Sequence, residues 1–250
     1  MSGYENVLVE NKDNGVTIIT LNRPEKKNAL NKQLIVELQD AFNTFDADES
    51  RKVAVLTGAG DAAFSAGADL KDMPELWRGI PTVGIQTDKP IISAVSGWCI
   101  GGALVMAMMT DLIVASESAK FYYPEAKVGF TGGIISGLVN RLPYHVAMEV
   151  ILLCRTLEAD RAYQLGFVNK VVPEGQQVQA AIEMADELAT MAPLVHRTLK
   201  SFINDDVMKR GPSEHMARTM HKLSALERSQ DTQEGFAAFR EKRQPVFVGK

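Results

Sequence analysis

Residues 91–133 read IISAVSGWCIGGALVMAMMTDLIVASESAKFYYPEAKVGFTGG and decide how the rest of the chain is interpreted. The opening run, Ile91–Val95, is typical of a buried strand, and a glycine-rich turn then leads into an apolar segment that ends at Asp111. A helix that begins at such a turn leaves backbone N–H groups without partners. These groups and the helix dipole suit a negative ligand or a developing oxyanion, which we expect near Gly101 and Gly102.

The same stretch contains one carboxylate in apolar surroundings. Glu125 stands between Pro124 and an apolar, glycine-rich run. Poor solvation disfavours the charged form of a carboxyl group, so its pKa should rise toward the range of a general acid or base. The preceding residues, Tyr122 and Tyr123, offer hydroxyl groups beside it. An oxyanion site with one tuned carboxylate predicts chemistry that passes through an enolate.

A membrane-spanning helix is the alternative interpretation of residues 91–109. This segment carries no charge and is long enough to cross a bilayer. Glycines and a Ser-Gly pair interrupt it, however, and no basic cluster flanks it. We therefore expect a strand, a turn and a buried helix, and no membrane partner.

Composition describes an ordinary globular protein. The chain has 250 residues, 46% hydrophobic and 23% charged, with a net charge of −4, which gives no global field for nucleic acid. Cys99 and Cys154 lie in apolar runs and are expected as buried packing residues, and the four histidines show no metal-ligand spacing. Because the histidines lack this spacing, we expect no bound metal. The N-terminus is too polar for a signal peptide, so we expect a cytoplasmic protein.

The flanking segments indicate an α/β fold. Val16–Leu21 and Val53–Thr57 are β-branched runs typical of strands, and Asn31 is placed to cap a helix between them. Strands that alternate with helical patterns indicate βαβ units. After Pro173 only helical patterns follow. We expect a core over residues 1–192 and a helical region over residues 193–250.

Three further glycine-containing segments could belong to known motifs. Gly58-Ala59-Gly60 resembles the start of a dinucleotide fingerprint, but Ala63 stands where its third glycine belongs and no helical pattern begins there. The glycines and Ser136 after residue 131 also miss the spacing of a nucleophile elbow. In FSAGADL (64–70), small residues allow close approach of the backbone to a ligand, while a plain turn is the alternative.

Three motifs together carry a resemblance. FSAGADL, SGWCIGG (96–102) and PEAKVG (124–129), in this order, resemble the crotonase, or enoyl-CoA hydratase/isomerase, family. RPEKKNAL (23–30) and the tail FREKRQPVF (239–247) are also similar to it. The resemblance implies a spiral of ββα units and a C-terminal helical region that forms trimers or dimers of trimers.

The resemblance also implies an active site. By motif position, the backbone N–H groups of Ala68 and Gly102 would hold the thioester carbonyl, and Glu125 would be the catalytic carboxylate. Hydratases of the family carry a second glutamate three residues after the second oxyanion residue. Val105 occupies that position here, and valine can neither orient water nor transfer a proton. The pattern therefore resembles the single-glutamate enoyl-CoA isomerases.

The expected substrate is an acyl-CoA, and no separate cofactor is implied. We expect the coenzyme A and acyl sites at these positions: Lys26, Ala29, Ala66, Gly67, Asp69, Leu70 and Lys242 for coenzyme A, and Trp77, Val105, Tyr122 and Tyr123 for the acyl group. The segment between Asp69 and Pro90 is shorter than in family hydratases, which should change the shape of the acyl pocket. Hydration, other CoA-enolate reactions and a non-catalytic acyl-CoA-binding protein remain alternatives.

Overall fold

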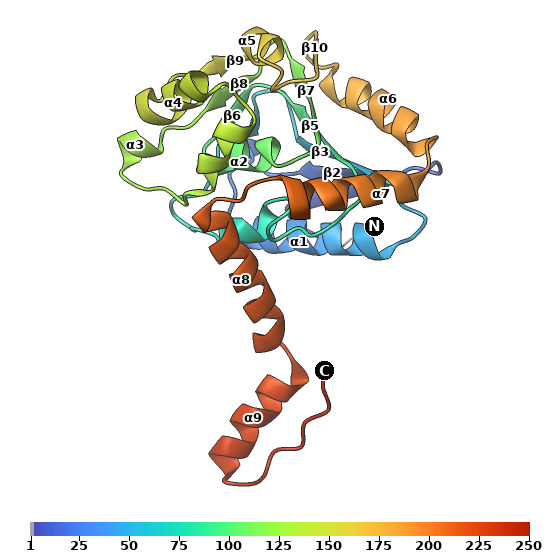
Figure 1. Cartoon of the computed structure of the whole chain (residues 1–250), viewed down its shortest axis with the longest axis vertical. Helices are drawn as coiled ribbons and strands as arrows, with labels where there is room; N and C mark the ends of the chain where they lie inside the picture. The colour runs from blue at the N-terminus through green and yellow to red at the C-terminus, as the bar shows by residue number, and fades with distance from the viewer. Residues whose placement is uncertain (1–2) are drawn as a thin grey trace.

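A computed structural model describes residues 3–250, which form two sheets covered by helices (Figure 1). The strands are β1 (Val7–Asn11), β2 (Val16–Leu21), β3 (Val53–Gly58), β4 (Ala63–Ser65), β5 (Ile91–Val95), β6 (Trp98–Ile100), β7 (Leu112–Ser116), β8 (Lys120–Tyr122), β9 (Leu157–Glu158) and β10 (Lys170–Val172). The α-helices are α1 (Lys32–Ala47), α2 (Gly102–Met108), α3 (Glu125–Val128), α4 (Tyr144–Leu153), α5 (Ala159–Gln164), α6 (Gln177–Ala189), α7 (Pro193–Phe202), α8 (Pro212–Glu227) and α9 (Gln230–Glu241). Shorter helical turns are η1 (Pro24–Lys26), η2 (Leu76–Gly79), η3 (Ile134–Asn140) and η4 (Ile203–Val207).

The larger sheet has the strand order β1-β2-β3-β5-β7-β10. The β1–β2 pair is antiparallel, and every later pair in this sheet is parallel. The predicted strands over residues 16–21, 53–57 and 91–95 are confirmed, and Asn31 caps α1 by accepting a hydrogen bond from the backbone N–H of Leu34. Strands of a parallel sheet are buried on both faces, which explains why these runs are apolar at almost every position.

The chain visits the two sheets in turn. Each of β3, β5 and β7 in the larger sheet is followed by a short strand, β4, β6 or β8, in a second sheet of order β4-β6-β8-β9. The last two of these strand pairs lead into α2 and α3. This repetition is the expected spiral of ββα units. The segment Trp98–Ile100, predicted as part of a turn, is instead the strand β6, since it pairs with both β4 and β8.

Alternating side chains of the larger sheet supply two separate cores. One face packs against α6, through residues such as Val55, Ile92 and Val114. The other face packs against α1, α2 and the second sheet, through residues such as Leu56 and Val95. Both cores bury β-branched and aliphatic side chains. Burial of apolar surface on both faces of the larger sheet therefore stabilises the spiral.

The C-terminal helices differ from the rest of the fold. Helix α7 has no fully buried residue, and α8 and α9 extend away from the two sheets (Figure 1). The expected boundary at residues 192 and 193 lies between α6, which packs on the larger sheet, and α7; it stays a prediction. Segment 91–109 is divided among β5, β6 and α2. In residues 3–250, no helix has both the length and the apolar character needed to cross a bilayer.

Candidate active site

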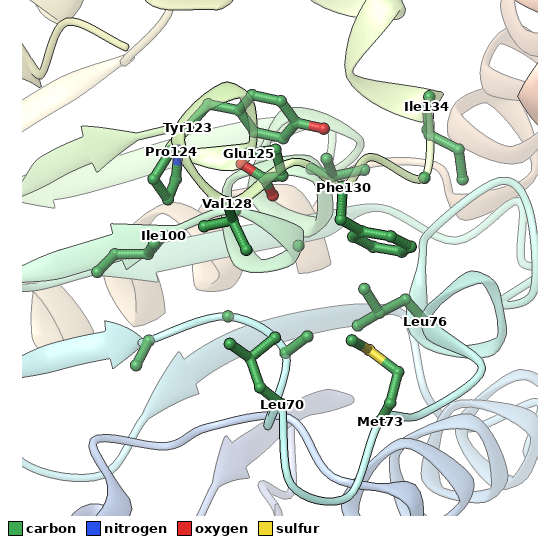
Figure 2. Close-up of a pocket in the computed structure, with 18 of the residues that line it drawn as sticks. Leu70, Met73, Leu76, Ile100, Tyr123, Pro124, Glu125, Val128, Phe130 and Ile134 are labelled. Carbon is green, nitrogen blue, oxygen red and sulfur yellow. The ribbon is translucent and has the colours of Figure 1, made fainter.

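A largely apolar cavity lies where the second sheet meets the segment after β4. We call residues 123–134 the first wall and residues 66–80 the second wall. Figure 2 shows Val128 and Phe130 of the first wall opposite Leu70, Met73 and Leu76 of the second, with the Glu125 carboxylate directed toward the space between them. The residues that line the cavity are Ala66, Gly67, Ala68, Leu70, Met73, Leu76, Ile80, Ile100, Gly101, Gly102, Val105, Tyr123, Pro124, Glu125, Val128, Phe130, Gly132, Gly133 and Ile134.

Backbone pairing fixes the loop Ala66–Asp69 at the edge of this cavity. The backbone N–H of Leu30 donates to the Gly67 carbonyl at 2.8 Å, and the N–H of Asp69 donates to the Leu30 carbonyl at 2.8 Å. The other side of the loop touches the β6–α2 turn, since a Cβ built on Gly67 would lie 2.6 Å from the Ile100 carbonyl oxygen and 3.7 Å from the Gly102 nitrogen. The AGAD and GG motifs, more than thirty residues apart in sequence, are therefore neighbours in space.

Two backbone N–H groups at this junction have no acceptor in the described part of the chain. Among the backbone hydrogen bonds of residues 3–250, none uses the N–H of Ala68 or of Gly102 as donor. Gly102 is the first residue of α2, where the helix offers its N–H groups no internal partner. Both residues line the cavity. Their N–H groups are thus available to an acceptor bound there.

Glu125 begins α3 and faces the same space. Its Oε2 atom is buried and has no hydrogen-bond partner among residues 3–250. Burial raises the pKa of Glu125 to about 7, because the charged form loses water and gains no compensating cation. A carboxyl group in this state exchanges its proton readily near neutral pH, which is what a general acid or base requires.

Val105 and Tyr123 complete the surroundings of this carboxyl group. Val105 lies one turn into α2, is 7% exposed and lines the cavity. The Tyr123 hydroxyl lies 2.7 Å from the Thr131 hydroxyl oxygen, and burial raises the pKa of Tyr123 to about 12. Glu125 is the only charged side chain among the residues that line the cavity.

Several residues expected at the site lie close to the cavity but outside its lining. Lys26 is exposed in η1 and Ala29 follows it, in the segment that pairs with the AGAD loop. Asp69 accepts a hydrogen bond from the Lys71 N–H and forms an ion pair with Arg23 at 3.2 Å. These two interactions lower the pKa of Asp69, the first more strongly, and they indicate that this carboxylate shapes the loop.

Three others are not brought to the cavity. Trp77 packs beneath Arg78 and edge-on against His221 of α8, and Tyr122 packs against Trp98. Lys242 is exposed at the end of α9, a helix that extends away from the two sheets (Figure 1). No three His, Cys, Asp or Glu side chains within residues 3–250 are grouped to hold a metal ion.

Sequence reasoning missed most of the apolar lining. Met73, Leu76 and Ile80 of the second wall and Val128, Phe130 and Ile134 of the first wall contact the cavity without belonging to a motif. Their common signal is an apolar residue within ten positions of a motif residue, in segments too short for a regular periodicity. Gly101 was expected as a turn residue, but its contact with Glu125 was not foreseen.

Comparison with known proteins places the chain in a family. Residues 11–250 match the family model described as enoyl-CoA hydratase/isomerase. The chain is 32% identical to a crotonyl-CoA hydratase of Syntrophomonas wolfei, covering 99% of both chains, and 33% identical to a carnitinyl-CoA dehydratase of Salmonella typhi, covering 93% and 94%. A crystal structure of a carnitinyl-CoA hydratase from Mycobacterium avium superposes with a TM-score of 0.77, at 35% identity and with 98% and 99% covered.

These matches extend over nearly the whole length of each relative. The chain belongs to the enoyl-CoA hydratase/isomerase family, within the crotonase superfamily, and is an acyl-CoA enzyme of that family.

Substitution of Gly101 by alanine should reduce turnover of an enoyl-CoA about a hundredfold, the cost of a small displacement of a catalytic group. A Cβ at this position would lie 2.7 Å from Glu125 Oε1, so the carboxylate must move. Gly60→Ala is a matched control, because Gly60 also has a positive φ but has open space around a Cβ. Steady-state kinetics and thermal unfolding of both variants provide the measurement; equal activity losses would contradict the proposed clash.

Proposed function

We propose that the protein shifts the double bond of an enoyl-CoA, with Glu125 as the single base and acid. Glu125 takes a proton from C2 of a β,γ-enoyl thioester, and the C–H electron pair moves into the thioester to give a dienolate. The oxygen electron pair then re-forms the thioester C=O bond, the C1–C2 double bond shifts to C2–C3, and the electron pair of the former C3–C4 double bond takes the proton from Glu125 at C4. The number of atoms and electrons is conserved, and no second reactant is needed.

The N–H groups of Ala68 and Gly102 would hold the dienolate oxygen. Negative charge develops on this atom only after the proton leaves C2, so fixed donors stabilise the transition state more than the substrate. Loss of one such donor typically costs a hundredfold to a thousandfold in rate, roughly. The absence of acceptors for both groups in residues 3–250 supports this role.

The observation that carries the proposal is the single carboxylate in the cavity. Hydration requires one group that activates water and another that moves the C2 proton. Glu125 supplies one such group, while Val105 presents an apolar surface at the position where family hydratases are expected to carry the other. Isomerisation needs only one group that gives back the proton it has taken, which fits a carboxyl with a pKa of about 7.

Hydration or dehydration is the second candidate, because the relatives are named crotonyl-CoA hydratase and carnitinyl-CoA dehydratase. A direct comparison decides between the two. Purified protein is given a β,γ-enoyl-CoA and, separately, an α,β-enoyl-CoA, and the absorbance of the conjugated thioester is followed. Formation of the conjugated product without its hydration supports isomerisation, and fast hydration refutes it. No turnover of either compound would favour an acyl-CoA-binding protein.

The pH dependence provides an independent prediction. Glu125 must be deprotonated to accept the C2 proton, so kcat/KM for isomerisation should fall about tenfold per pH unit below about pH 7 and level off above it. If Glu125 instead had to donate a proton to the free substrate, kcat/KM would fall above pH 7 and level off below it. Initial rates between pH 5 and 9, with binding of the saturated butyryl-CoA measured in parallel, distinguish the two.

Coenzyme A binding and assembly complete the proposal. Lys26 and Ala29 flank the AGAD loop, whose small residues allow an extended ligand to approach its backbone. Helices α7 and α9 expose large apolar side chains, among them Leu194, Phe236 and Phe239, the last at 85%. Such exposure supports association of copies through the C-terminal helices, as a trimer or a dimer of trimers, in which Lys242 would approach a neighbouring site.

A further inference from the structure

Helix α8 touches both walls of the cavity, although none of its residues lines it. Its first turn lies against the first wall at Gly133, and its middle lies against Trp77 of the second wall and against Thr82, two residues beyond that wall. At the cavity itself the two walls face each other across open space (Figure 2). Both walls also pack on the β6–α2 turn, the second through Leu76 against Gly102 and the first through Glu125 against Gly101. The helix therefore forms a physical link between two segments whose separation determines the width of the cavity.

The contact with the first wall is close. Gly133 has a φ of +77°, and a Cβ built on it would overlap the Ser213 hydroxyl of α8. One residue later, Glu214 is 5% exposed, accepts a hydrogen bond from the Gly211 N–H and lies 3.1 Å from the position of a Cβ on Gly137. The N-terminal turn of α8 is thus packed against the backbone of this wall, where even a methyl group would not fit.

The contact with the second wall is polar and aromatic. The Nη1 group of Arg218 donates a hydrogen bond to the Thr82 carbonyl at 2.8 Å. One turn further along α8, the His221 ring packs edge-on against Trp77, with 6.1 Å between ring centroids. Trp77 is part of η2, and the preceding residue of this turn, Leu76, lines the cavity. These two side chains hold the segment that carries the second wall.

Away from the β6–α2 segment, few contacts fix the position of either wall. Val128 and Phe130 of the first wall are 55% and 51% exposed, and Gly132 has no atom within 4 Å of a built Cβ. The second wall rests on α1 and α2, where Gly79 packs against Ile35 and Met106. Such segments shift easily when one of few contacts is lost.

We propose that α8 acts as a strut between the two walls, and that Arg218 and His221 are positioning residues that set the width of the acyl cavity. Loss of either contact lets the second wall move outward, which weakens the fit to a small acyl group more than the fit to a bulky one. This inference rests on the proposal that the cavity holds the acyl group, but it is independent of which reaction follows.

The test uses binding of saturated thioesters, which undergo neither isomerisation nor hydration. Dissociation constants for butyryl-CoA, the bulkier 4-methylpentanoyl-CoA and free coenzyme A are measured by calorimetry with wild type, Arg218→Met and His221→Ala. In Arg218→Met we expect butyryl-CoA to bind about tenfold more weakly, since a hydrogen bond to a charged group is lost. 4-Methylpentanoyl-CoA should lose less, and coenzyme A should be unaffected.

Two matched controls isolate the proposed contact. Asp205→Asn removes the ion-pair partner of Arg218 at 3.5 Å but keeps its bond to Thr82, and Lys222→Met removes an exposed cation from the same helix. Both should leave the ratio of the two acyl-CoA affinities unchanged. His221→Ala should change the ratio in the same direction as Arg218→Met, and it carries the test if Arg218→Met does not fold.

If a folded variant binds butyryl-CoA and 4-methylpentanoyl-CoA with equally weakened affinity, or if the ratio of the two affinities does not change, the proposed role of α8 is wrong. A wild-type protein that binds butyryl-CoA but isomerises no enoyl-CoA would refute the proposed reaction and leave the strut intact. Failure of wild type to bind any acyl-CoA would refute both.

Discussion

Replacement of Glu125 by glutamine should abolish isomerisation, with a loss of about a thousandfold in kcat, within the range that general acid–base groups contribute. Glutamine fills nearly the same space but cannot take a proton from C2 or deliver one to C4. Because Glu125 is the only charged group in the lining, no neighbour is placed to replace it. Spectrophotometric assay of a β,γ-enoyl-CoA at pH 8 measures the loss.

Binding distinguishes lost chemistry from lost structure. The affinity for butyryl-CoA should change little in Glu125→Gln, since the ligand contacts the backbone donors of Ala68 and Gly102 in the proposed complex. Glu117→Gln, which neutralises an exposed carboxylate outside the cavity, should retain full activity. Undiminished turnover in Glu125→Gln would remove the single-base mechanism, whatever the fate of the other proposals.

The same substitution should stabilise the folded protein at high pH. The folded-state pKa of Glu125 is raised from 4.5 to about 7, so the unfolded chain loses this proton first and stability falls as pH rises from 4.5 to 7. Above pH 7 the buried charge should cost about 1–2 kcal/mol after allowance for solvent screening. Glutamine avoids this cost, and urea unfolding at pH 5 and pH 8 should therefore show a gain at pH 8 alone.

The sequence was sufficient to predict the strands of the larger sheet. These strands are buried on both faces, so each appears as a continuous apolar run between turn residues. The short strand β6 was missed because three residues between glycines carry no detectable periodicity. It pairs with β4 and β8, which lie about thirty-five and twenty-two residues away in the sequence, and local patterns contain no information on such pairing.

The site was predictable where backbone geometry demands small residues. The resemblance pointed to Ala68, Gly102 and Glu125, and the structure brings all three to one cavity with Val105. Tyr122 and Tyr123 were indistinguishable in sequence, yet only Tyr123 lines the cavity. Successive side chains at the end of a strand point to opposite faces, and Tyr122 therefore packs against Trp98 instead.

Trp77 illustrates a second limit. It is a large aromatic residue in the segment expected to cover the acyl group, but it turns away from the cavity toward α8, while Leu76 and Ile80 line the wall. Its ring packs against His221, which is far from Trp77 in the sequence. No local pattern could have shown that a C-terminal helix would contact this segment.

Introduction of a carboxylate at Val105 should have the largest effect on reaction choice. Val105→Glu would place a second acid/base group one turn after Gly102, on the same face of α2, where it could orient water toward C3 of an α,β-enoyl-CoA. Wild type should hydrate this substrate far more slowly than it isomerises a β,γ-enoyl-CoA. The variant should gain measurable hydration, so the ratio of the two rates should move toward hydration by a hundredfold, roughly.

The gain should come with a loss of stability. Val105 is 7% exposed, and a carboxyl group buried there without a cation should destabilise the fold by roughly 2–4 kcal/mol at neutral pH. Val105→Gln is the matched control, because glutamine brings similar size and polarity but transfers no proton. If the hydration rate rises in both variants, a polar side chain at position 105 is sufficient and a second acid/base group is not required. Hydration by Val105→Glu alone, lost again when Glu125→Gln is added, would show that the reaction depends on two carboxyl groups and that Val105 holds the wild type to one.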